Sequence, residues 1–152
     1  MDYFNRLLGG VISFFSTYIH VHLNDKKQKE QITAALISEV KALLVIFERR
    51  KYLPEMRAAL GDIQSGKFNT IALSIHFNDR YSKIYQANID KLGVLESCIA
   101  SKIIEFHHLV DSFILDVSEG GAASKGTDAR IINELIAILE RAVEIGKELE
   151  SA

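Results

Sequence analysis

Apolar residues recur at helical spacing over most of the chain. Between Lys26 and Leu53 they are separated by steps of four, four, three and four residues, which places them on one face of an α-helix. No Gly or Pro occurs between Gly10 and Pro54, so the preceding segment can continue into this helix. The pattern predicts one long helix, whose apolar face carries Ile32, Leu36, Val40, Leu43 and Phe47.

Further helices are predicted beyond this one. Pro54 either ends the long helix or starts a short helix over residues 55–64. The segment 78–92 again favours a helix, and Gly93 is suited to the left-handed conformation that closes it. A helix from about residue 95 to 117 is predicted as the centre of the bundle. Its apolar stripe is Leu95, Ile99, Ile103, Phe106, Val110, Phe113 and Val117.

One segment has the alternation of a strand rather than of a helix. In Thr70–Phe77 every second residue is a large apolar one. No second strand or hairpin signal supplies a partner, and an isolated strand leaves its backbone groups unpaired. We therefore expect helix or irregular structure here.

The C-terminal helix is predicted to begin after a linker of small and polar residues at 118–127. Asp128 can cap the helix. Apolar residues then repeat every seven positions, which suits packing on the bundle and equally suits self-association with a second copy. The residues of this stripe are Ile131, Leu135, Ile138, Ala142, Ile145 and Leu149.

No charged side chain occurs from Leu7 to Asn24, and three lysines follow at Lys26, Lys27 and Lys29. A hydrocarbon core of about 30 Å needs about 20 helical residues, which this stretch supplies with little to spare. We therefore predict a membrane-spanning helix followed by a basic cytoplasmic flank. A buried core helix is the alternative, because five polar side chains interrupt the apolar ones. The apolar residues of the predicted span are Leu7, Leu8, Val11, Ile12, Phe14, Phe15, Ile19, Val21 and Leu23.

Charge is divided unevenly between the two halves of the chain. Residues 1–91 contain 13 Lys and Arg against 9 Asp and Glu, whereas residues 92–152 contain 5 against 11. Anionic lipids of the inner leaflet attract a basic segment, so we expect a single-pass protein of the inner membrane with its C-terminal part in the cytoplasm. The basic run 49–51 lacks interleaved aromatic residues, and we predict no nucleic-acid binding.

The sequence contains no complete catalytic or metal-binding motif. The lone Cys98 fits a reducing compartment. Residues 125–127 read Lys-Gly-Thr, not the Gly-Lys-Thr of a phosphate-binding loop. His107 and His108 are adjacent and diverge on a helix, while His107 with Asp111 is more typical of a hydrogen-bonded surface pair than of a metal site. We predict no catalytic residue, cofactor or metal ion.

Residues 80–110 resemble a loose group of small bacterial and prophage membrane-anchored proteins of unassigned function. In that group a tyrosine-x-x-asparagine segment precedes leucine-glycine-x-leucine, and an isoleucine-rich helix ends near phenylalanine-tyrosine. His107 stands where the tyrosine is usual. The resemblance implies an all-helical cytoplasmic bundle on a membrane tether and transfers no activity. The matching positions are Tyr85, Asn88, Leu92, Gly93, Leu95 and Phe106.

The sequence as a whole predicts an all-α protein, in which an N-terminal transmembrane helix continues into a long amphipathic helix packed in a three- to four-helix bundle. Its parts are a membrane anchor (1–24), a bundle core (25–117), a flexible linker (118–127) and a C-terminal helix (128–152). The favoured function is a non-enzymatic, membrane-tethered interaction protein. An oligomerising, membrane-acting effector and a soluble bundle that binds a small ligand in its core are the alternatives.

Overall fold

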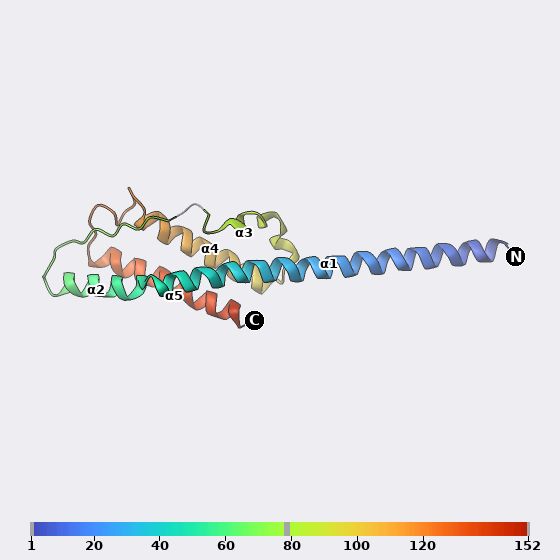
Figure 1. The fold of residues 1–152 in the computed structure, drawn as a ribbon, viewed down its shortest axis with the longest axis horizontal. Coiled ribbons are helices and arrows are strands. Elements are labelled where there is room, and N and C mark those ends of the chain that lie inside the picture. Colours follow the sequence, from blue (N-terminus) through green and yellow to red (C-terminus); the bar gives the residue numbers. More distant parts are fainter. Residues whose placement is uncertain (1, 78–79, 152) are drawn as a thin grey trace. The chain divides into compact units, whose positions relative to one another are not determined.

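The computed structural model describes residues 2–77 and 80–151, with side chains from residue 24 onward. The described chain is all-helical, as predicted, and contains no strand. Its elements are α1 (Asp2–Arg49), α2 (Tyr52–Gln64), α3 (Lys83–Gln86), the 3-10 helix η1 (Ile89–Val94), α4 (Ser97–Val117) and α5 (Ala129–Glu150) (Figure 1).

The chain divides into two compact units, Met1–Ala34 and Ala35–Ala152. We call them unit 1 and unit 2. Unit 1 is the first part of α1, and it contains the predicted span, whose side chains lie outside those that the structure describes. None of the helices in the described residues is both long and apolar enough to cross a membrane.

Unit 2 begins with the last turns of α1. This helix ends before Leu53, the end that the sequence predicts. The helix stops at Arg49, and Lys51 adopts a left-handed conformation with φ 54° before α2 begins. This break turns Tyr52 into the core, where its ring lies 6.1 Å from that of Phe47 and 6.2 Å from that of Phe113. Pro54 therefore lies in the first turn of α2, where its missing N–H costs nothing.

The apolar stripe predicted for α4 is largely buried. Six of the seven residues in its predicted stripe are buried, and only Ile99 is half-buried. Helix α5 packs alongside α4 and also contacts α2 (Figure 1). Its N-cap is the predicted one, since the N–H of Ile131 donates to Asp128 Oδ1 at 3.1 Å.

The apolar stripe of α5 is used within the chain. Its Leu135, Ala142, Ile145 and Leu149 are buried in unit 2, and α4 and α2 are the helices that α5 packs against. A coiled coil with a second copy through this stripe would have to displace those contacts. The other two residues of the stripe, Ile131 and Ile138, are half-buried, and self-association through α5 stays a prediction.

The helix predicted over residues 78–92 is wrong in extent. Within the described part of this segment, residues 80–92, only α3 and the first part of η1 form, separated by Ala87 and Asn88. Gly93 lies inside η1, and its φ is not left-handed. A Cβ at Gly93 would meet no heavy atom within 4 Å. The predicted left-handed turn is therefore also wrong, and nothing at this position requires glycine.

Thr70–Phe77 is irregular, as expected, but it is extended and it has a partner. We call it the edge segment, and it is part of the green trace that follows α2 in Figure 1. The loop 117–127 supplies its hydrogen bonds. That loop is packed rather than a free linker, because Ala123 and Thr127 are buried. The inner N–H groups of the edge segment, those of Ile71, Leu73 and Ile75, donate to Thr127 O, Ala123 O and Val117 O.

Candidate functional site

Unit 2 buries a carboxylate at the junction of three helices. Glu39 of α1 is only 8% exposed. Its Oε1 accepts the N–H of Ile84 at 2.7 Å, and its Oε2 accepts the N–H of Tyr85 at 2.9 Å. These N–H groups belong to the first turn of α3, which has no intrahelical acceptor for them. Glu39 therefore acts as a long-range cap that fixes α3 to α1.

His107 of α4 lies against this carboxylate and is fully buried. Its Nε2 is 3.7 Å from Glu39 Oε2, which is longer than a hydrogen bond. The ring of Tyr85 stacks on the imidazole with centroids 3.9 Å apart, and Phe106 meets it edge-on at 5.4 Å. Among the described residues, neither imidazole nitrogen has a hydrogen-bond partner.

Burial sets the protonation of this imidazole. It lowers the pKa of His107 to about 4, against a raising effect from Asp111 and a further lowering effect from His108. The imidazole is therefore neutral at pH 7. Asp111 is itself engaged, because Tyr81 donates its hydroxyl hydrogen to Asp111 Oδ1.

The polar groups of Glu39 and His107 are not accessible to a ligand. Both carboxylate oxygens of Glu39 accept hydrogen bonds from backbone N–H groups, and the ring of Tyr85 covers one face of the His107 imidazole. Within the described residues no group of three or more His, Cys, Asp or Glu could hold a metal ion. The cluster is thus a polar joint that connects α1, α3 and α4.

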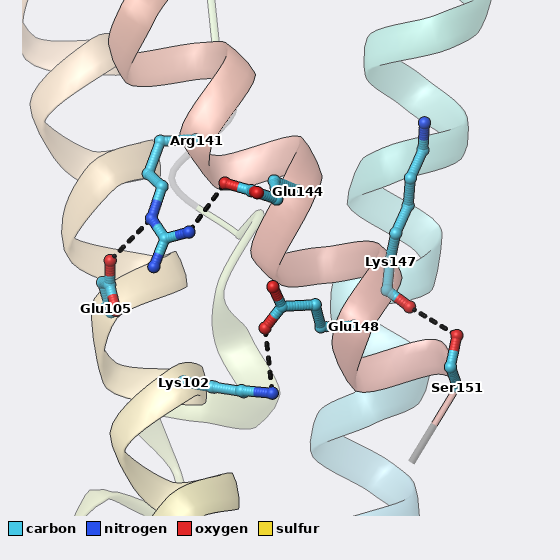
Figure 2. A network of polar contacts seen from close by, with 7 residues as sticks. All are labelled: Lys102, Glu105, Arg141, Glu144, Lys147, Glu148 and Ser151. Carbon is cyan, nitrogen blue, oxygen red and sulfur yellow. Dashed lines mark hydrogen bonds and ion pairs between the residues drawn. The ribbon is translucent and has the colours of Figure 1, made fainter.

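Charged side chains on the outer face of α4 and α5 form a second network (Figure 2). Arg141 of α5 forms ion pairs with Glu105 of α4 at 3.0 Å and with Glu144 at 2.7 Å. Both contacts raise the pKa of its guanidinium, and the hydrogen bond to Glu144 has the larger effect. Lys102 pairs with Glu148 at 2.9 Å and lowers the pKa of that carboxyl. These side chains are exposed, so the pairs align the two helices and add little stability.

A groove opens on the other side of α5. It has a volume of about 380 Å³ and is walled by α1, α2 and α5. Its lining combines apolar side chains with charged side chains of both signs. Val45, at its edge, is 44% exposed. We call this the α5 groove, and its lining residues are Leu44, Val45, Phe47, Glu48, Leu53, Pro54, Arg57, Val143, Lys147 and Glu150.

The residues singled out in the sequence do not converge on one place. Cys98 is exposed, His76 is exposed on the edge segment, and His108 faces away from its buried neighbour. The predicted basic flank lies in unit 1, where Lys26 and Lys27 are exposed. The predicted hydrogen-bonded pair of His107 and Asp111 is not formed, because neither His107 nitrogen has a hydrogen-bond partner in the part of the chain that the structure describes.

Sequence reasoning missed Glu39 as a functional residue, although a signal was present. Glu39 follows Leu36 by three positions and precedes Leu43 by four, so it lies within the apolar stripe of α1. A carboxylate on a buried face requires a hydrogen-bonding partner from elsewhere in the fold. His107 carries the same signal, since it lies four residues after Ile103 and three before Val110.

Comparison of the chain with protein-family models, with curated proteins and with solved structures gave no match.

Proposed function

We propose that this protein is a non-enzymatic interaction module, in which unit 2 binds the apolar face of a helix from a partner protein. The observation that carries the proposal is the α5 groove. Exposed apolar surface next to a charged rim is typical of sites that bind other proteins.

The walls of the groove favour a helix as the occupant. All three are helices, and the backbone groups within helices are already paired, so they cannot add a strand. An amphipathic helix needs only apolar contact and compatible charges at the rim. Glu48 and Lys147 supply both signs, and neither forms an ion pair with the described residues.

Val45→Asp tests the groove, because it places a carboxylate at the apolar edge. Leu115→Asp is the matched control, since Leu115 is a 72% exposed apolar residue that does not line the groove. Proximity labelling in native cells should enrich the same partner with the wild type and with L115D, and lose it with V45D. A synthetic helix from that partner should bind the wild type at least tenfold more tightly than V45D, which corresponds to about 1.4 kcal/mol. Equal binding to V45D would exclude the groove.

We further propose that residues 7–24 hold the protein on a membrane surface. A transmembrane helix has no support from the structure, but the sequence carries a different pattern. Its hydroxyl residues and one histidine recur at steps of three, one and three, at Ser13, Ser16, Thr17 and His20. An α-helix with this spacing has one polar and one apolar face, apart from His22, and is typical of helices that lie in the headgroup region.

Phe15→Glu and Ser16→Glu form a matched pair for this proposal, because they place the same charge on the apolar face and on the polar face of that helix. The full-length wild type and S16E should sediment with vesicles that contain anionic lipid, while F15E should stay in the supernatant. Alkaline carbonate should release the wild type from native membranes. Retention after carbonate would favour a spanning helix, and loss of vesicle binding in both variants would contradict the amphipathic arrangement.

A further inference from the structure

The edge segment pairs its backbone on one side only. In an extended chain, successive N–H and C=O groups point to opposite sides. The inner groups bond to the loop 117–127 at 3.1, 2.9 and 2.8 Å. The outer groups point the other way, and no backbone partner for them occurs among the described residues. These outer residues are Thr70, Ala72, Ser74 and His76, and all four side chains are exposed.

Native proteins usually block such an edge. Lysine, proline or an inward-pointing charge on the edge prevents another strand from pairing with it. The outer residues of the edge segment contain no Lys, Arg, Asp, Glu or Pro. Two of them, Ala72 and Ser74, are small enough to let another backbone approach closely. The edge segment is therefore open to strand addition.

A trench runs beside the edge segment, between it and α2. It consists of two depressions, of about 180 and 530 Å³. Glu55 of α2 borders both of them, and its carboxylate has no ion-pair partner among the residues that the structure describes. Phe68, at the wider end, is 47% exposed and lies beside Ala59 and Ile71 in the lining.

We propose that this trench binds an extended peptide of a partner protein, which adds as a strand to the outer edge of Thr70–Phe77. The free backbone groups require an extended occupant. The carboxylate of Glu55 selects a basic side chain, and the apolar surface around Phe68 takes an aliphatic one. Helix α2 forms the opposite wall, so the space suits a single strand rather than a second folded copy. This site is separate from the α5 groove.

Ser74→Pro tests the role of the backbone. It removes an outward N–H that has no backbone partner among the described residues, and proline is tolerated at such edge positions. Ser74→Ala is the matched control, because it keeps the N–H and removes only the hydroxyl. Random octapeptides displayed on phage are selected against the full-length chain. The enriched peptides should contain β-branched residues and one Lys or Arg at a fixed position, and should bind S74P at least tenfold more weakly than S74A.

Glu55→Lys tests the charge on the exposed face of α2, independently of any backbone change. Selection against this variant should replace the fixed Lys or Arg by Asp or Glu. If S74P proves unfolded by circular dichroism, E55K decides the matter alone. Failure to enrich any peptide, equal binding to S74P and S74A, or an unchanged charge preference with E55K would each overturn the proposal. A negative result would not contradict the proposal for the α5 groove, because V45D tests a different surface.

Discussion

Glu39→Ala is expected to lower the free energy of unfolding by about 3 kcal/mol. The substitution removes the acceptor for two N–H groups, and that of Tyr85 is buried. A hydrogen bond to a charged acceptor contributes about 1.5–3 kcal/mol, and an orphaned buried donor costs about 1–3 kcal/mol. Small domains are stable by only about 5–15 kcal/mol, so the loss should be plain in urea denaturation.

Glu48→Ala is the control, because Glu48 lies on the same helix and is exposed. It should change the stability by less than about 0.5 kcal/mol. Glu39→Gln keeps one acceptor oxygen and should fall between the two. Hydrogen exchange gives a local readout, since the amides of Ile84 and Tyr85 should lose protection in E39A before those of α5. If E39A matched E48A in stability, the carboxylate would not be the joint between α1 and α3.

The helices that pack through a repeated apolar stripe were predictable from the sequence. The stripe of α4 recurs at steps of three and four, and that period is sufficient to define a buried helical face. Asp128 was predictable as a cap, because a short acidic side chain before an apolar run is a local signal. In both cases the information lies within one turn or one helix of the residue concerned.

What could not be predicted depends on contacts between distant segments. Lys51 is left-handed without being glycine or asparagine, because the burial of Tyr52 requires a break at that point. Helix α3 is four residues long and owes its start to Glu39, 45 positions away from Ile84. The edge segment finds its partner in a loop that the sequence describes as a linker. The helix and turn propensities of neighbouring residues give no information on contacts between segments so far apart in the sequence.

The pH dependence of stability should report the burial of His107 directly. Its pKa is lowered from 6.5 to about 4 in the folded protein, chiefly by burial. Between these two values the unfolded chain binds a proton that the folded chain does not, so stability falls as the pH is lowered. The contribution is fully present above pH 6.5 and is lost by about pH 4. At 1.36 kcal/mol per pKa unit, it amounts to about 3 kcal/mol.

His107→Phe isolates this effect, because it removes the titrating group and keeps a ring to stack on Tyr85. The other ionisable groups are common to both chains, so their effect on stability cancels in the comparison. The difference between wild type and H107F is therefore the quantity to measure, by urea denaturation from pH 7.5 to pH 4. The wild type should lose about 3 kcal/mol more than H107F over this range.

His108→Gln supplies the control within the same helix, since His108 is exposed. This variant should keep the steep decline of the wild type, because the buried imidazole is still present. At pH 7.5, H107F should be as stable as the wild type or more so, since phenylalanine has no nitrogen to leave unpaired in the core. An equal decline in H107F and wild type would show that the imidazole of His107 is exposed to water before the protein unfolds. The contact region of α1, α3 and α4 would then not be closed to solvent.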